Sequence, residues 1–214
     1  METLILTSAG IESTVAVAMA LKNGERPYLL HFSLGRKSDI NELHYVNYQS
    51  TKLRLPSKLI DLTAMQNLFS GVMEREWLFS EGDVACPSEV SFLPGLIELS
   101  ILFAKQAGLE KISVGLTKEQ LPKERLKSIE LLQESNDLFH SKFIKVKIEL
   151  PFAHQEKSEV IKLGESLKVD FQQSWSCLEG NESHCGVCQS CVSRKTAFKK
   201  AGVEDPTKYQ KHSQ

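Results

Sequence analysis

The stretch Thr3-Leu4-Ile5-Leu6-Thr7-Ser8-Ala9-Gly10-Ile11-Glu12-Ser13-Thr14 changes character between its two halves. Residues 3–7 form an apolar run typical of a buried strand, and residues 8–14 interrupt it with small and hydroxyl side chains. A helix is predicted from Thr14 to a stop at Asn23-Gly24. A buried strand, a small-residue loop and the start of a helix form an anion-binding arrangement, because free N–H groups and the positive end of the helix dipole meet the anion. We therefore interpret residues 8–14 as a phosphate-binding loop.

Strands and helices alternate along the rest of the chain. Further strands are predicted at 27–34, 57–62, 111–115 and 143–148, and helices at 40–53, 64–74, from 92 to the stop at Gly108, at 123–139 and at 156–167. Residues 81–87 are expected to form a long loop. This alternation predicts an α/β fold, in which helices cover both faces of a parallel sheet. Ligands of such folds bind beyond the carboxyl ends of the strands, here near Ser8, Gly35, Leu62 and Gly115.

Four of the five cysteines, Cys177, Cys185, Cys188 and Cys191, share the spacing C-x7-C-x2-C-x2-C. Thiolates two residues apart can turn toward one ion, and four of them describe a closed, structural zinc site with no position open for substrate. His184 is a competing ligand, and disulfides or an iron–sulfur cluster are alternatives. The odd cysteine number favours a metal over disulfides in a reducing compartment.

Composition indicates an ordinary globular protein of 214 residues, with 26 basic and 27 acidic side chains. This balance gives no nucleic-acid signature. Neither a leader nor a run of about 18 apolar residues is present, so we expect a cytoplasmic protein without a membrane segment. We divide the chain into an α/β domain at 1–172 and a zinc-binding segment at 173–214.

Two segments resemble known enzymes. Residues 8–13 resemble the pyrophosphatase loop of N-type ATP pyrophosphatases, usually Ser-Gly-Gly-x-Asp-Ser. The tail resembles that of the QueC family of 7-cyano-7-deazaguanine synthases, through Ser174-Trp175-Ser176-Cys177, residues 184–198 and residues 201–209. Weaker similarities lie in Phe92-Leu93-Pro94-Gly95, in Gly115 and in Lys157, which falls where the family often has lysine.

The resemblance implies an adenine nucleotide alpha hydrolase-like, Rossmann-like fold with a structural zinc. It also implies a ligase that adenylates 7-carboxy-7-deazaguanine with ATP, forms the amide with ammonia, adenylates again and releases the nitrile. The nucleotide would be held by Ser8, Ala9, Gly10, Ser13, Thr14, Gly95 and Gly115, with Glu12 and Ser13 as the catalytic pair and Mg²⁺ beside the acidic residue. A homodimer or a heteromeric complex is compatible with this family.

Several positions depart from the family pattern. Ala9 stands where the family has glycine, and Glu12 stands where it has aspartate. Leu96-Ile97 replaces Arg-Asn, and residues 117–125 lack the pattern Gly-Tyr-Pro-Asp-Cys-Arg. If position 9 needs a positive φ, a Cβ there costs about 1 kcal/mol. An acidic group displaced by ~1 Å can slow a reaction about a hundredfold.

These departures support a second hypothesis, that the chain is a catalytically diverged binding or regulatory subunit, for which a bacterial antiphage defence system is one setting. Titration with Mg·ATP separates it from the ligase hypothesis. His31, in a predicted buried strand, is interpreted as a core histidine. Glu98, in the helix after Pro94-Gly95, is a further candidate for the pocket.

Overall fold

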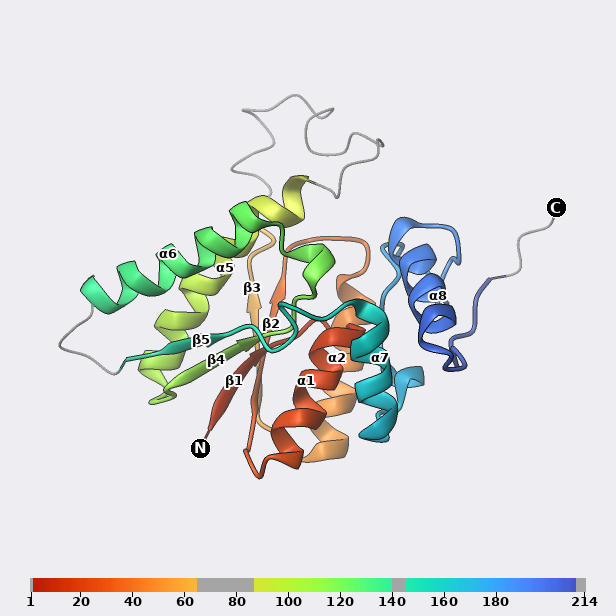
Figure 1. Ribbon diagram of the computed structural model, residues 1–214, viewed down its shortest axis with the longest axis horizontal. Coiled ribbons are helices and arrows are strands. Elements are labelled where there is room, and N and C mark those ends of the chain that lie inside the picture. The colour runs from red at the N-terminus through yellow and green to blue at the C-terminus, as the bar shows by residue number, and fades with distance from the viewer. Residues whose placement is uncertain (1, 65–86, 140–144, 211–214) are drawn as a thin grey trace.

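A five-stranded parallel sheet forms the centre of the computed structural model, which describes residues 2–64, 87–139 and 145–210 (Figure 1). The strands are β1 (Thr3–Leu6), β2 (Tyr28–Ser33), β3 (Ser57–Asp61), β4 (Lys111–Val114) and β5 (Lys147–Glu149). Their order is β3-β2-β1-β4-β5, and all four pairings between these strands are parallel. The predicted α/β class is therefore confirmed. The order reverses direction between β1 and β4, which is where a doubly wound sheet opens a crevice for a ligand.

Helices cover both faces of this sheet. They are α1 (Ile11–Lys22), α2 (Asp39–Leu53), α5 (Pro87–Gln106), α6 (Lys123–Phe139), α7 (Lys157–Ser166) and α8 (Gln189–Ala201), with 3₁₀ turns at Lys118–Gln120 and Phe171–Gln173. In Figure 1, α5 and α6 lie on one side of the sheet, and α1, α2 and α7 lie on the other, with α8 beyond α7. Within the described ranges, no helix is both long and apolar enough to cross a membrane.

The two faces have separate apolar cores. One core joins Ile5 of β1 to Val15 of α1, Ile161 of α7 and Phe198 of α8. The other packs Leu4, Ile112 and the α5 residues Ile97 and Ile101 together. Alternate residues of β1 thus feed opposite cores, as the two-residue period of a strand requires. Helix α8 contributes to the first core, and the cysteine-rich tail packs against α7.

Some predicted boundaries were wrong. Helix α1 begins at Ile11, not at Thr14, because Gly10 in an extended conformation serves as its N-cap. Helix α5 begins at Pro87 and includes Pro94 in its interior, although the start of a helix is where proline costs least. Strand β5 runs from Lys147 to Glu149, later than predicted. The predicted segments 65–74, 81–86 and 143–144 lie outside the described residues.

Helix α8 was not predicted from the sequence. Its buried face consists of Cys191, Arg194, Ala197, Phe198 and Ala201, which follow helical spacing. The helix was missed because a thiol and a guanidinium occupy two of its inward-facing positions, where a prediction from apolar periodicity looks for aliphatic side chains.

Candidate functional site

Hydrogen bonds to both backbone groups of Ala9 hold the loop between β1 and α1 in place. Ala9 is fully buried, with φ of 54° in the left-handed region. Its N–H donates to Thr7 Oγ1 at 3.0 Å, and its carbonyl accepts from the N–H of Trp175 at 2.8 Å. Position 9 therefore does adopt a positive φ, the conformation in which a Cβ is costly. The contact to Trp175 also ties the loop to the C-terminal tail.

Hydroxyl groups fill the first turn of α1. Thr14 Oγ1 donates to the Gly10 carbonyl at 2.7 Å, and Ser13 Oγ donates to the same oxygen at 3.3 Å. Thr7 Oγ1 donates to Ser13 Oγ at 3.1 Å. The first N–H groups of a helix have no intrahelical partner, and the helix dipole makes this end positive. The loop and helix start can therefore bind an anion.

A cavity of about 250 Å³ lies at the carboxyl ends of β1, β2 and β4. It is lined by five of the predicted site residues, namely Ser8, Gly10, Glu12, Ser13 and Gly115. Ala9 is buried and does not line the cavity. Thr14 faces Gln49, whose Nε2 donates to its hydroxyl at 2.9 Å. Gly95 is exposed on α5 and, like Glu98, does not line this cavity. The structure thus brings the loop and Gly115 together and leaves Gly95 apart from them.

Lys157 at the start of α7 pairs with the acidic residue of the loop. Its Nζ lies 3.0 Å from Oε1 of Glu12, and both side chains are largely buried. Lys157 was marked in the sequence only by resemblance. The pairing means that a cation bound by Glu12 would have to share the carboxylate with this ammonium group.

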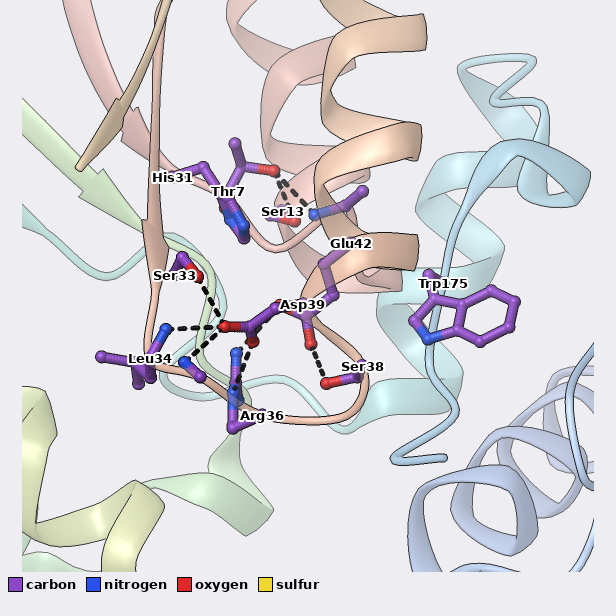
Figure 2. Close-up of polar contacts among 12 residues, drawn as sticks. Thr7, Ser13, His31, Ser33, Leu34, Arg36, Ser38, Asp39, Glu42 and Trp175 are labelled. Carbon is purple, nitrogen blue, oxygen red and sulfur yellow. Dashed lines mark hydrogen bonds and ion pairs between the residues drawn. The ribbon is translucent and has the colours of Figure 1, made fainter. Parts of the chain in front are cut away.

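A second polar network follows β2 and was not predicted from the sequence (Figure 2). Oδ2 of Asp39 accepts from the N–H groups of Leu34 and Gly35, both at 2.7 Å, and from Ser33 Oγ at 2.8 Å. Although burial pushes the pKa of Asp39 upward, these hydrogen bonds and the charge of Arg36 hold it below its ordinary value. Asp39 thereby shapes the turn that leads from β2 into α2.

Arg36 joins the two acids of this network. Its guanidinium lies 3.2 Å from Asp39 Oδ1 and 2.9 Å from Glu42 Oε2. Ser38 Oγ donates to the other oxygen of Glu42 at 2.7 Å. Burial raises the pKa of Glu42, against the opposing charge of Arg36. Arg36 and His31 both line the cavity, so β2 and the turn after it supply polar groups that periodicity alone could not identify.

The four predicted cysteine ligands come together. The sulfur atoms of Cys177, Cys185, Cys188 and Cys191 all lie within 4.8 Å of one another. Tetrahedral thiolates around one Zn²⁺, with Zn–S bonds of about 2.3 Å, place the sulfurs about 3.8 Å apart. The donor set therefore fits a metal ion, and no disulfide joins these cysteines. His184 is not among the gathered ligands, because its Nε2 accepts from the N–H of Ser176 at 3.1 Å.

The cysteine thiols differ in acidity. Burial raises the pKa of Cys177 and of Cys191. Burial also opposes ionisation of Cys185, but hydrogen bonds from the N–H groups of Cys188 and Val187 outweigh it and lower the pKa of this thiol to about 7. Burial and the nearby charge of Arg194 lower the pKa of His184 to about 4. Near neutral pH the thiol of Cys185 therefore ionises more readily than those of Cys177 and Cys191, while His184 is neutral.

Arg194 holds the tail together, and its side chain is fully buried. The guanidinium donates to Asp205 Oδ1 at 3.2 Å, to Ser174 Oγ at 2.9 Å and to the carbonyl of Phe171 at 2.9 Å. A buried guanidinium needs such a complete set of acceptors. It fixes α8, and with it the cysteine group, to the segment that leads back to the loop.

The sequence matches a known family over nearly its whole length. A sequence model described as "Queuosine biosynthesis protein QueC" matches residues 2–202. The chain belongs to the QueC family. A QueC relative from Sulfurisphaera tokodaii, "7-cyano-7-deazaguanine synthase 1", is 32% identical over 209 residues, covering 98% of each chain. A "7-cyano-7-deazaguanine synthase" from Caldicellulosiruptor bescii is 26% identical over 219 residues and also covers 98% of each.

Solved structures confirm the fold of this QueC family member. An NMN synthetase from Francisella tularensis superimposes with a TM-score of 0.55 at 15% identity, covering 94% of this chain and 77% of that one. A 4-thiouridine synthetase in complex with RNA and ATP gives a TM-score of 0.57 at 16% identity, covering 94% and 50%. At these identities the similarity shows the adenine nucleotide alpha hydrolase-like fold alone.

Proposed function

We propose that the chain binds ATP at the β1–α1 loop and uses it to adenylate a carboxylate, with 7-carboxy-7-deazaguanine as the candidate substrate. The observation that carries this proposal is the cavity bounded by Ser8, Gly10 and Ser13, at the reversal of strand order, in a chain of the QueC family. A phosphate chain would accept from the free N–H groups of α1 and from the two hydroxyls.

The proposed reaction uses ATP to create a leaving group. A carboxylate oxygen attacks the α-phosphorus, and pyrophosphate leaves. Ammonia then displaces AMP from the acyl adenylate and loses a proton, which gives the amide. The amide oxygen attacks the α-phosphorus of a second ATP, and pyrophosphate leaves. Departure of AMP with that oxygen, together with loss of both N–H protons, then gives the nitrile.

The loop residues would have distinct roles in this scheme. Ser13 and the N–H groups of α1 would stabilise charge that builds up on the phosphates. Glu12 is the candidate ligand for Mg²⁺, which prefers carboxylate oxygens and substrate phosphates. Lys157, already paired with Glu12, would place a positive charge beside the departing pyrophosphate.

We also propose that Cys177, Cys185, Cys188 and Cys191 hold a structural Zn²⁺. Four thiolates saturate the ion, so its contribution is to cross-link the tail. Because the Trp175 N–H bonds the Ala9 carbonyl, an ordered tail supports the loop at a distance from the metal.

Calorimetric titration with Mg·ATP tests the binding step. We expect heat from the wild-type protein and little from Ser8→Asp, which places a negative charge in the proposed phosphate site. Ser135→Asp, at an exposed position on α6, is the matched control and should bind as the wild type does. Absence of heat from the wild type would reject the proposal in favour of a diverged binding or regulatory subunit.

Release of pyrophosphate and AMP in the presence of 7-carboxy-7-deazaguanine and ammonia tests the chemistry. The variants Glu12→Asp and Ala9→Gly, which restore the usual loop pattern, should raise turnover if the site is a working ligase. Binding of ATP with no release of either product would leave a nucleotide-binding protein and reject the ligase.

A further inference from the structure

His31 has one ring nitrogen in use and one without a partner. The residue is 1% exposed, and its Nδ1 lies 2.8 Å from the carbonyl oxygen of Thr7 (Figure 2). A carbonyl oxygen only accepts hydrogen bonds, so Nδ1 carries a proton and donates it to Thr7. In the described part of the chain, Nε2 is buried with no hydrogen-bond partner.

The unpartnered nitrogen belongs to a residue that lines the candidate site. His31 shares the cavity with Ser8, Gly10 and Ser13, which form the proposed phosphate cradle. A buried polar atom without a hydrogen bond costs free energy, and such atoms are uncommon in folded proteins. A molecule bound in the cavity can supply the missing bond.

The tautomer decides which chemical group this molecule must offer. A neutral imidazole with its proton on Nδ1 presents a lone pair at Nε2, and so accepts hydrogen bonds there. Ionised phosphate oxygens only accept and cannot pair with it. On ATP the groups that donate are in the nucleoside half, namely the ribose hydroxyls and the exocyclic amine.

We propose that Nε2 of His31 accepts a hydrogen bond from the nucleoside half of ATP and makes this residue a determinant of nucleotide specificity. The proposal rests on the proposed function, because it takes ATP as the occupant of the cavity. The bond of Nδ1 to Thr7 holds the ring in place, so the acceptor is oriented before the ligand arrives. In this arrangement one ATP molecule would contact His31 on β2 through its nucleoside and the loop after β1 through its phosphates.

Two substitutions separate the two ring nitrogens. The amide nitrogen of an asparagine side chain reaches about as far as Nδ1, so His31→Asn keeps the bond to Thr7 and loses the acceptor in the cavity. The amide oxygen of a glutamine side chain reaches about as far as Nε2, so His31→Gln keeps the acceptor and loses the bond to Thr7. We expect His31→Asn to melt close to the wild-type temperature and to bind ATP about tenfold more weakly, the effect of one hydrogen bond. We expect His31→Gln to melt lower and to keep more of its affinity.

Nucleotide analogues identify the donor and need no variant. Wild-type protein is titrated with ATP and with three analogues. 2′-Deoxy-ATP lacks the 2′-hydroxyl, 3′-deoxy-ATP lacks the 3′-hydroxyl, and ITP lacks the exocyclic amine. One analogue should bind the wild type about tenfold more weakly than ATP does. For that analogue alone, His31→Asn should cause no further loss, because the contact is already missing.

The outcomes are distinct from those of the proposed function. A wild-type protein that does not bind ATP would reject the proposed function and this inference together. A wild type that binds ATP, with His31→Asn binding equally well, would reject the inference alone. So would a loss in His31→Asn that is equal for all four nucleotides, since this indicates a phosphate contact or a structural effect.

Discussion

Gly115 packs directly against the backbone of Glu12. A Cβ on Gly115 would lie 3.0 Å from the carbonyl carbon of Glu12 and 3.1 Å from the amide nitrogen of Ser13. These are backbone atoms of the first turn of α1, so they cannot rotate aside as a flexible side chain would. The end of β4 and the start of α1 are thus locked together at the cavity, and glycine is what permits the contact.

We expect Gly115→Ala to lower the free energy of unfolding by about 1–3 kcal/mol, because the added methyl forces the first turn of α1 away from β4. The shift should also weaken ATP binding. Gly95→Ala is the matched control, since a Cβ there meets open space inside a helix and should stabilise by about 1 kcal/mol. Urea denaturation and calorimetry measure both effects. Equal stability of the two variants would contradict the packing argument.

Ala9→Gly should be tolerated far better than an alanine-to-glycine change inside a helix. At φ of 54° the Cβ of Ala9 is strained, so its removal offsets the usual entropic cost of glycine. Ala18 in α1 supplies the comparison, because glycine there gains nothing. We expect Ala9→Gly to be more stable than Ala18→Gly by about 1 kcal/mol in urea denaturation. The reverse order would show that the strain at Ala9 is negligible.

The purified chain should contain about one zinc ion, and Cys188→Ser should lose it. Because the metal cross-links the tail, a strong chelator should lower the melting temperature of the wild type and leave that of Cys188→Ser unchanged. Atomic emission gives the metal content and calorimetry the melting temperature. Cys86→Ser, a change outside the described residues, is the control and should keep its zinc. Full zinc content in Cys188→Ser would contradict the four-thiolate site.

Arg194→Met should lower the free energy of unfolding by about 3–5 kcal/mol, because it leaves Asp205 and the Phe171 carbonyl without their buried partner. Lys199→Met, on the exposed side of the same helix, controls for the loss of one positive charge and should change stability little. Chemical denaturation of both variants provides the comparison. A loss below about 1 kcal/mol for Arg194→Met would indicate that the tail is held mainly by the metal.

The stabilisation supplied by Asp39 should depend on pH. Its pKa in the folded protein is below the ordinary value of 3.8, so the folded state favours the ionised carboxylate. The contribution is therefore fully present above the pKa of the unfolded chain and is lost as pH falls through the lowered folded pKa. At pH 7 we expect Asp39→Asn to be less stable than the wild type by about 1–3 kcal/mol, and this gap to narrow as the pH falls below 3.8 and through the lowered folded pKa.

Denaturation curves of the wild type and Asp39→Asn across this pH range measure the gap. Glu110→Gln, at an exposed position, removes a carboxylate without buried hydrogen bonds and should show no comparable gap. A difference between the wild type and Asp39→Asn that stays constant with pH would contradict the lowered pKa.

Much of the fold follows from local pattern. Short apolar runs predicted the ends of β1 to β4 to within about a residue, because a strand buried in a sheet is apolar along its length. Helices were predicted from the spacing of apolar side chains on one helical face. Helix α8 was not predicted, because Cys191 and Arg194 occupy its buried face and interrupt the apolar pattern. The cysteine group was predicted completely, since the spacing of ligands around an ion is itself a local property.

The sequence alone determined the parallel α/β architecture, the small-residue loop between β1 and α1, and the four gathered cysteines. Only the tertiary structure decided that Lys157 faces Glu12, that a Cβ on Gly115 would crowd the backbone of α1, and that His31, whose Nε2 has no hydrogen-bond partner, lines the cavity. The physical reason is the separation along the chain of the residues that interact. Periodicity and ligand spacing act over a few residues, whereas these three relationships join elements far apart in the chain, and their geometry exists only once the sheet and its helices have packed.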